Sequence, residues 1–220
     1  GEDEVESVTV SGSITEVGTE DNVPSAAKVV DGEEDVTANY TITYVNGTLA
    51  ITTSTKELKV VANSNSWEYD SEEHADGGYT VTYGEESHTV AAGESATLST
   101  GDTVTATITA TVKNVADTVE GNNEIVTLVI ANAEQYANVV TENGTLTITP
   151  AALTITADSN SKEYDGEALT DNGWMDTAPA GLKGEDEVES VTVTGSITEI
   201  GTVANVASAA KVVDGEEDVT

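Results

Sequence analysis

The stretch Asp102–Val112, which reads DTVTATITATV, alternates apolar and polar side chains without interruption. One face carries threonines, and the other carries only apolar residues, namely Val104, Ala106, Ile108 and Ala110. A period of two is the pattern of a β-strand that has one buried face and one wet face. Three further stretches alternate in the same way: Glu124–Ala131, Val188–Val193 and Tyr40–Val45.

Helical patterns are weak throughout the chain. The best candidate, Ser208–Val213, is short and fits a strand equally well. Short strands separated by turns rich in Gly and Asn are typical of β-sandwiches. The sequence therefore predicts an all-β fold made of tandem Ig-like β-sandwich modules in a linear array. A β-grasp-like module is the alternative, and a helix packed across a sheet would identify it.

Two nearly identical stretches contain an Asn-Gly pair, NGTLAIT at Asn46–Thr52 and NGTLTIT at Asn143–Thr149. Asn and Gly both tolerate the positive φ of a type I′ turn, and the pair is a strong hairpin signal between alternating residues. We therefore expect a hairpin turn at each Asn-Gly pair.

The chain also contains a long direct repeat. Its first stretch, Gly1–Thr37, returns as Gly184–Thr220 with only five differences, Ser11/Thr194, Val17/Ile200, Glu20/Val203, Asp21/Ala204 and Pro24/Ala207. Such a repeat indicates an excerpt of a tandem array, and arrays of this kind usually provide length, stiffness or multivalency.

A weaker repeat lies inside the long one. Leu58–Asp70 reads LKVVANSNSWEYD and Leu153–Asp165 reads LTITADSNSKEYD, so each opens a unit with a strand and a polar turn. We predict the back part of one unit at 1–54, a complete unit at 55–150, and the front part of another unit at 151–220.

Composition excludes several classes of partner. The formal net charge is −34, and all seven basic residues are lysines. Nucleic-acid binding requires a basic surface, and anionic membranes repel an acidic one, so neither is expected as a partner. The chain contains no Cys and no run of apolar residues long enough for a membrane-spanning helix, so membrane insertion is not expected. Alternating Val, Ile and Thr can bury one face, which favours a folded chain over a disordered one.

The repeat resembles a known family. Its opening ITADSNSKEYDG (Ile155–Gly166), its middle GEDEVESVTVTGSITEIGT (Gly184–Thr202) and its close DVTANYTITYVNGTLAIT (Asp35–Thr52) resemble the YDG/MBG-type tandem repeats of bacterial cell-surface adhesins. In the unit 55–150, Ser71 stands where the motif has Gly, and Trp67 replaces the Lys found at Lys162. The resemblance implies an extracellular stalk module at the bacterial surface, of a kind sometimes described as binding mucin or glycans.

Acidic clusters are the candidate metal sites. Two copies of Asp-Gly-Glu-Glu-Asp surround a Gly turn, and carboxylates on a flexible loop suit Ca²⁺. The candidate calcium ligands are Asp31, Glu33, Glu34, Asp35, Asp214, Glu216, Glu217 and Asp218. Solvated acidic turns that bind no metal are the alternative, so the expected cofactor is none or calcium.

Few aromatic residues are available to contact a sugar. Tyr69 and Tyr164 occupy equivalent positions in their units, and so do Tyr79 and Trp174, which favours a shared role in packing. Trp67 has no aromatic counterpart. We therefore take Trp67 as the candidate ligand-contact residue.

Lys28 and its copy Lys211 are candidates for an internal Lys–Asn isopeptide crosslink, because both lie in a semi-apolar stretch. Asn39 and Asn46 are the available partners of Lys28. The alternative is that these lysines are solvated residues of edge strands. No catalytic constellation is evident, because the two histidines, His74 and His88, lack the neighbours that a catalytic or metal site would require. Both are expected in exposed loops.

Three functions follow as hypotheses. The first is a non-catalytic extracellular stalk segment, which binds host ligands weakly and many times over, if at all. The second is a glycan- or mucin-binding module centred on Trp67. The third is a filament subunit, because the front unit at 151–220 lacks the strands that Ala38–Thr52 of another copy could add head to tail.

Overall fold

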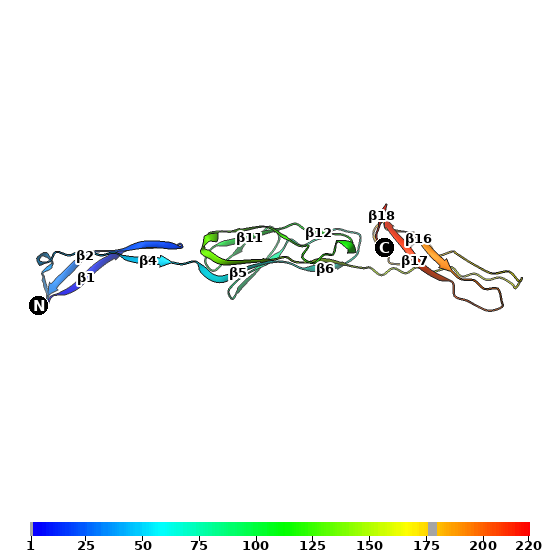
Figure 1. The fold of residues 1–220 in the computed structure, drawn as a ribbon, viewed down its shortest axis with the longest axis horizontal. Coiled ribbons are helices and arrows are strands. Elements are labelled where there is room, and N and C mark those ends of the chain that lie inside the picture. The colour runs from blue at the N-terminus through cyan, green and yellow to red at the C-terminus, as the bar shows by residue number, and fades with distance from the viewer. Residues whose placement is uncertain (1, 176–179) are drawn as a thin grey trace.

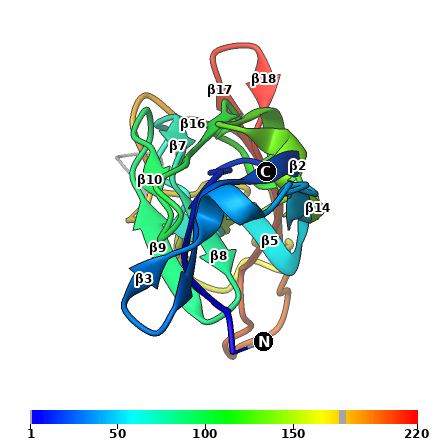
Figure 2. The same ribbon diagram turned by 90° about the vertical axis from the view of Figure 1, so that its left-hand side faces the viewer.

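A computed structural model describes residues 2–175 and 180–220. The chain forms a rod in which three parts follow one another along the long axis (Figure 1). Seen along that axis, the parts lie one behind another (Figure 2). We call residues 1–54 the N-terminal part, residues 55–150 the middle unit, and residues 151–220 the C-terminal part.

The middle unit is a β-sandwich. Its strands are β5 (Ser54–Ala62), β6 (Asn65–Glu68), β7 (His74–Ala75), β8 (Tyr79–Tyr83), β9 (Glu86–Val90), β10 (Ala96–Thr97), β11 (Thr103–Ile108), β12 (Thr111–Val112), β13 (Ile125–Ile130), β14 (Tyr136–Glu142) and β15 (Leu146–Thr149). One sheet has the order β14–β5–β8–β9 and the other has the order β10–β11–β13. Two small pairs, β15–β6 and β12–β7, extend the unit toward the C-terminal part.

The core of the middle unit lies between the two sheets. Leu58 and Val60 of β5 meet Val104 of β11, and all three are fully buried. The expected alternation is confirmed over β11, because Ala106 and Ile108 also face this core while the intervening threonines do not. The expected single strand Asp102–Val112 is wrong in its extent, because Thr109 and Ala110 lie in no strand and β12 pairs with β7 in another sheet. A second, smaller cluster packs Tyr69 with Val112, Leu146 and Ile148.

The expected all-β fold is confirmed. In the described part of the chain, the helices are three-residue 3₁₀ turns: η1 (Thr37–Asn39), η2 (Val115–Asp117) and η3 (Ala133–Gln135). None of these turns is long enough to pack across a sheet as the β-grasp alternative requires. Among the described residues, no helix has the length and apolar character to cross a membrane.

The expected turns at the Asn-Gly pairs are wrong. Strand β14 pairs in parallel with β5, and β15 pairs in parallel with β6, so the chain passes through Asn143 and Gly144 without reversing. Neither pair has a residue at positive φ. Gly144 is needed for space instead, because a Cβ there would lie 1.9 Å from the carbonyl oxygen of Asn63.

The N-terminal part contains β1 (Glu4–Ser11), β2 (Gly18–Asp31), β3 (Glu34–Asp35) and β4 (Gly47–Ile51). The long strand β2 pairs antiparallel with β1 and β3 along one half and with β4 along the other half. The expected strand at Tyr40–Val45 is wrong, since this stretch pairs with no strand. Its counterpart in the middle unit, β14, is held by β5. No described strand of the N-terminal part pairs with Tyr40–Val45 in this way.

The C-terminal part contains β16 (Glu187–Thr194), β17 (Val206–Asp214) and β18 (Glu217–Asp218). The pairing of β16 with β17 repeats that of β1 with β2, with irregularities at the same places. Ser208–Val213, the best helix candidate, lies within β17. In the described part of the stretch before Trp174, β-pairing consists of two isolated bridges, one from Ala157 to Trp174 and one from Leu169 to Ile197.

Candidate functional site

Trp67, the candidate ligand-contact residue, is half-buried on β6. Its ring stacks on that of His74 with centroids 4.7 Å apart and planes 14° apart. Nε2 of His74 lies 3.0 Å from Oδ1 of Asp70. The expectation of exposed loop histidines is wrong, because His74 and His88 lie on strands and are half-buried. Trp67 therefore has one ring face covered by its own unit.

The acidic clusters form tight hairpins. In each, Gly and Glu make a two-residue turn in which Asp31 pairs with Glu34, and Asp214 pairs with Glu217. Gly32 and Gly215 both have φ of 61°, which only Gly adopts without strain. No group of three or more His, Asp or Glu side chains gathers into a metal site anywhere in the described residues. The structure thus does not bring the candidate calcium ligands together.

Lys28 and Lys211 have acidic partners. Lys28 forms an ion pair with Glu6 on the neighbouring strand, and Lys211 forms the equivalent pair with Glu189. The hydrogen bond to Glu6 raises the pKa of Lys28. The amide of Asn46 donates to Asp21 at 3.0 Å instead. This is the arrangement of solvated cross-strand pairs rather than of a buried crosslink.

Side-chain bonds hold the middle unit to the C-terminal part. Nζ of Lys113 lies 2.6 Å from Asp214, and Nδ2 of Asn114 donates to Glu217 at 2.9 Å. On another side of the joint, Lys183 pairs with Glu68 at 3.1 Å. One face of the joint is therefore held by the β17–β18 hairpin, which is the predicted calcium loop.

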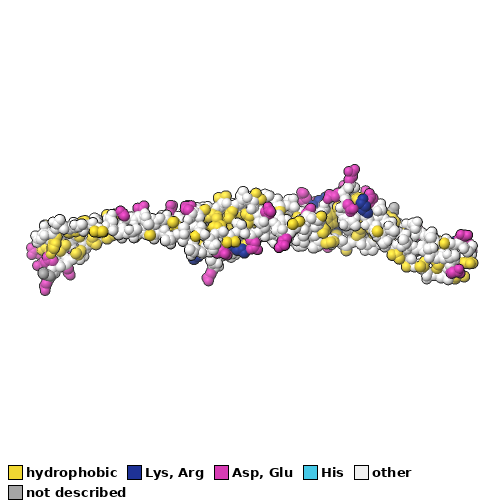
Figure 3. Space-filling view, in the orientation of Figure 1, with side chains coloured by type: hydrophobic (Ala, Val, Ile, Leu, Met, Phe, Trp, Pro, Cys, Tyr) yellow, Lys and Arg dark blue, Asp and Glu magenta, His cyan; other side chains and the backbone are white. Residues whose placement is uncertain are grey.

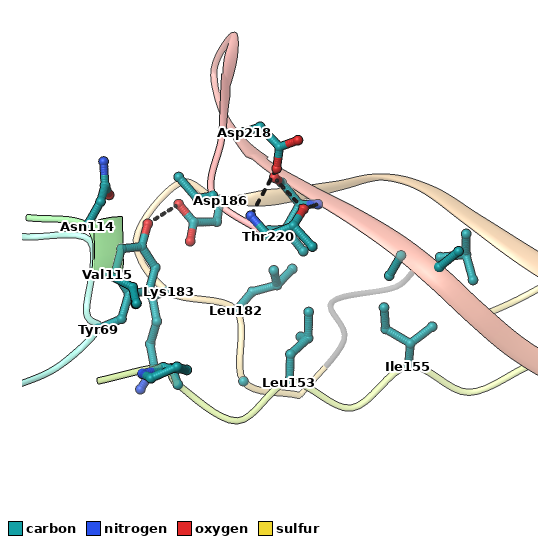
Figure 4. A pocket seen from close by; sticks show the side chains of 18 of the residues that line it. Tyr69, Asn114, Val115, Leu153, Ile155, Leu182, Lys183, Asp186, Asp218 and Thr220 are labelled. Atoms are coloured by element: carbon teal, nitrogen blue, oxygen red, sulfur yellow. Dashed lines mark hydrogen bonds between the residues drawn. The ribbon is translucent and has the colours of Figure 1, made fainter. Parts of the chain in front are cut away.

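A groove of about 510 Å³ opens beside this joint (Figure 4). The hydroxyl of Tyr69 at its rim donates to Asp186 at 3.2 Å. Burial and this hydrogen bond raise the pKa of Tyr69 to about 12. Leu153 and Ile155 point into the groove and are half-buried, whereas their counterparts in the middle unit are core residues.

A second groove of about 690 Å³ lies at the far end of the C-terminal part. Two stretches line it, Ser159–Asp171 and Gly195–Asn205. Among the described residues, no strand pairs with Asn160–Glu163 or with Gly201–Asn205 along this groove. An antiparallel bridge between Leu169 and Ile197 joins the two stretches. Asn160–Glu163 and Gly201–Asn205 present unpaired main chain in the described residues, and such main chain can form β-pairs with another segment.

In the middle unit, Asn123 holds together the region that corresponds to this groove. Nδ2 of this fully buried residue donates to the carbonyl oxygens of Asn63 and Asp76 at 2.8 and 2.9 Å. The main chain of Asn123 forms an antiparallel bridge with Gly144, with hydrogen bonds of 3.1 and 3.0 Å. Asn123 thus joins two loops of the opening segment to the closing strand.

Asn205 repeats the side-chain hydrogen bonds of Asn123. Its Nδ2 donates to the carbonyl oxygens of Asp158 and Asp171, both at 2.9 Å. These two residues are the counterparts of Asn63 and Asp76. No strand pairs with the main chain of Asn205 in the described residues, since β17 begins only at Val206.

Asn22, the copy of Asn205 in the N-terminal part, repeats the main-chain pairing of Asn123. Its main chain pairs with Gly47 in the β2–β4 ladder. Gly47 is the counterpart of Gly144, because both open a Gly-Thr-Leu sequence. The C-terminal part therefore has the side-chain bonds of this site, the N-terminal part has its main-chain pairing, and the middle unit has both.

The loss of the closing strand is visible at the tyrosines. Tyr69 is 9% exposed, because Leu146 and Ile148 of β15 pack against it. Its counterpart Tyr164 is 62% exposed at the second groove. The expectation that both tyrosines serve in a core is therefore wrong for Tyr164, which no strand covers among the described residues.

No family model, curated protein or solved structure matches this chain. The resemblance to YDG/MBG-type repeats therefore stays a prediction. Sequence reasoning did not find the asparagines that organise the site. A signal was present, however: Asn22 and Asn205 are identical in the long repeat, although Glu20 and Asp21 are replaced in the second copy.

Proposed function

We propose that this chain is a non-catalytic repeat segment in the stalk of a bacterial surface adhesin. The observation that carries the proposal is the arrangement of its parts in line, with a joint held by side-chain bonds (Figure 1). Modules in line lengthen a protein in proportion to their number. A stalk needs this property to hold a distal domain away from the cell.

The surface charge fits the same function. Acidic side chains are spread along the rod, while lysines are few (Figure 3). A net charge of −34 keeps neighbouring rods apart and in solution. An extracellular location at the bacterial surface, as the repeat resemblance implies, belongs to this proposal.

We favour the stalk over a glycan- or mucin-binding module. That alternative depends on Trp67 as an exposed platform, and sugar stacking requires an open ring face. Trp67 is half-buried and its ring is stacked on His74. Enzymatic activity is not proposed, because His74 is engaged by Asp70 and Trp67 rather than by a nucleophile.

The rod shape can be tested by measuring how the length of the particle changes with the number of repeats. Chains with one, two and three copies of the long repeat are expected to show a maximum dimension in small-angle X-ray scattering that rises linearly with copy number. Their cross-section should stay constant. A maximum dimension that rises only with the cube root of mass would indicate a compact particle and overturn the stalk.

The location is tested separately. Antibodies raised against the middle unit are expected to label intact cells of the bacterium that makes this protein, without permeabilisation. Protease treatment of intact cells should remove the label. Labelling only after permeabilisation would contradict a surface stalk.

A further inference from the structure

The β-sandwich of the middle unit has one open side. Along its closed side, β9 of one sheet lies next to β10 of the other. Along the opposite side, β14 ends one sheet and β13 ends the other, and no described strand pairs with the outer edge of either. The middle unit has both its opening strand, β5, and its closing strand, β15, so the edge of β13 is not one that a missing part of the same unit would cover.

The main-chain groups of β13 alternate in direction. The amide of Ala131 donates to the carbonyl of Thr103 at 2.9 Å, next to the β11–β13 ladder, which is regular from there back to Thr127. In an antiparallel ladder, successive residues direct their amides and carbonyls to opposite sides. Leu128 and Ile130 therefore direct theirs away from β11, toward the open side.

The side chains of β13 leave this edge apolar. The stretch Ile125–Ala133 contains no charged residue, although the whole chain has 41 acidic ones. Val126 and Val129 are 60% and 63% exposed. Edge strands that avoid pairing with other chains usually carry a lysine, a proline or an inward-pointing charge. Strand β13 has none of these features.

The other type of unit has a lysine at this place. Counting six residues from Asn123 leads to Val129, and counting six from its equivalent, Asn205, leads to Lys211. The first copy of that stretch likewise has Lys28. Both lysines are partly exposed and form ion pairs with the neighbouring strand. The middle unit therefore replaces a charge that opposes association with an exposed valine.

We propose that β13 pairs antiparallel with β13 of a second copy of the chain, so that two rods lie side by side. The outward main-chain groups determine the register, because Leu128 of one copy then exchanges both hydrogen bonds with Ile130 of the other. This register uses the outward groups of both residues in both copies, and it places Val129 opposite Val129 on the twofold axis. The proposal goes beyond the stalk function and does not rest on it.

A second copy suits this edge better than a flexible peptide does. Its β13 is already held in an extended conformation by β11, so pairing orders little new chain, whereas a free peptide would lose its conformational freedom. Directly opposite β-branched residues stabilise a pair of strands, and directly opposite like charges destabilise it. The choice between valine and lysine at Val129 therefore acts on self-pairing in particular, because this residue faces its own copy.

The acidic surface opposes the contact. Each chain has a net charge of −34, and antiparallel pairing brings Glu124, before β13 of one copy, toward Glu134, after β13 of the other. The screening length falls from about 10 Å at 0.1 M salt to about 3 Å at 1 M. Association should therefore strengthen as salt is added, whereas a contact made by ion pairs would weaken.

A cysteine on the axis tests the register, since the chain has no Cys of its own. Opposite residues of a pair without hydrogen bonds have Cα atoms about 4.5 Å apart, which is within the range of a disulfide. Val129→Cys should therefore cross-link two copies. Val126→Cys is the matched control, because Val126 is equally exposed. It lies three residues from the axis, which separates its two copies by about 20 Å.

Oxidised glutathione is the oxidant in this experiment, so that two protein thiols become one disulfide and two reduced glutathiones are released. The Val129→Cys chain should form covalent dimers about tenfold or more faster than the Val126→Cys chain. Gel electrophoresis without reductant measures both rates. Equal rates, or no covalent dimer from the Val129→Cys chain, would overturn the pairing.

The second test measures association of the chain without cysteine, by light scattering across concentration at about 0.1 M and about 1 M NaCl. The mass should rise toward twice that of one chain and no further, because a twofold contact closes on itself. The rise should be larger at high salt. Small-angle scattering should show a wider cross-section with nearly unchanged length, as expected for rods side by side.

Two lysine variants complete this test. Val129→Lys gives the edge the residue of the other unit type and should keep the chain monomeric with unchanged circular dichroism. Thr89→Lys makes the same change of charge at an exposed site on β9, on the closed side, and should associate like the original chain. Equal association of the two variants, or an original chain that is monomeric at every concentration and salt, would overturn the proposal.

Discussion

At the scale of single residues, Asn123 joins the opening loops of the middle unit to its closing strand. It is fully buried, and its side chain donates hydrogen bonds to two main-chain carbonyls. Leaving buried acceptors without a donor costs about 1 to 3 kcal/mol each. A single amide side chain therefore contributes a large share of the stability of one unit.

Replacement of Asn123 tests that contribution. Asn123→Ala is expected to lower the unfolding free energy of the middle unit by about 3 kcal/mol, because two carbonyls lose their donor. Urea unfolding followed by Trp67 fluorescence, in a Trp174→Phe background, would measure it. Asn205→Ala is the control, since its bonds lie in the C-terminal part. An equal loss from both variants would contradict this assignment.

Gly144 illustrates a glycine kept for space rather than for φ. Gly144→Ala is expected to destabilise the middle unit by about 3 kcal/mol or more, because the added carbon collides with main chain at Asn63. Thermal unfolding would show the loss. Gly93→Ala, at a site with open space but a φ of 81°, should cost only about 1 kcal/mol. The opposite ranking would argue for a turn at Gly144.

Tyr136 and Asp102 give the middle unit a pH-dependent bond. The hydroxyl of Tyr136 donates to Asp102 at 2.6 Å and lies 2.7 Å from Oγ1 of Thr100. The bond from Tyr136, followed by those from Asn132 and Thr100, lowers the pKa of Asp102 below its ordinary 3.8. Burial first, and then Asp102, raise the pKa of Tyr136 from 10.0 to about 12.

Tyr136→Phe is therefore expected to cost about 1 kcal/mol at neutral pH. A depressed carboxyl pKa stabilises the fold above pH 4 and loses that effect as pH falls through the lower folded value. A raised phenol pKa stabilises it below pH 10 and loses that effect toward pH 12. The difference in unfolding free energy between the original chain and the Tyr136→Phe variant, measured by chemical unfolding, should thus shrink at both extremes. A constant difference would show that the hydrogen bond to Asp102 is not its source.

At the scale of elements, the length of a strand depends on how many of its residues have a partner strand to pair with. Strand β2 has 14 residues, whereas its repeat copy β17 has 9. The missing five are Gly201–Asn205, and their counterparts Gly18–Asn22 pair with β4. A strand's hydrogen bonds lie between segments, so two stretches that share three of their five residues form a strand in one place and irregular structure in the other.

Hydrogen exchange tests this difference directly. Mass spectrometry should find slower amide exchange in the peptide covering Gly18–Asn22 than in the one covering Gly201–Asn205, by about tenfold or more. Equal exchange in the two copies would contradict this difference in pairing.

At the scale of the whole molecule, the joint determines how straight the rod is. Lys113–Asp214 and Lys183–Glu68 are ion pairs whose lysine side chains are about one-third exposed, at 34% and 32%. Such solvent-exposed pairs contribute little to stability. Their effect should therefore be on the angle between units rather than on unit folding.

The double variant Lys113→Ala, Lys183→Ala is expected to shorten the average end-to-end distance and to leave thermal unfolding of the units nearly unchanged. Small-angle scattering at low salt would measure the distance. Lys28→Ala, which removes an ion pair away from the joint, should keep the original dimensions. Identical scattering of all three chains would show that other contacts hold the joint.

Much of the fold was predictable from sequence because it depends on local periodicity. The alternation in Asp102–Val112 predicted β11 and its buried face, and the alternation in Val188–Val193 predicted the strand that the structure has as β16. The partner of each strand was not predictable in the same way. Tyr40–Val45 has the pattern of a strand, yet no segment of the N-terminal part offers it an edge.

The candidate site was less predictable than the fold. Trp67 and the acidic turns were prominent in the sequence. In the structure, His74 covers one ring face of Trp67, and the hairpin geometry keeps the carboxylates of the acidic turns apart. Asn205 and its groove had no motif, since the site forms only where Asp158 and Asp171 meet it in space. Side chains that bind main-chain carbonyls leave little trace in a single sequence.

The sequence by itself determined that this protein is an acidic, all-β repeat chain, because charge and period-two alternation are local properties of the residues. The tertiary structure decided which strands pair and that the chain passes through the Asn-Gly pairs without a turn. It also decided which strand edges have no partner in the described residues. The physical reason is that β-pairing satisfies main-chain groups through segments distant in sequence.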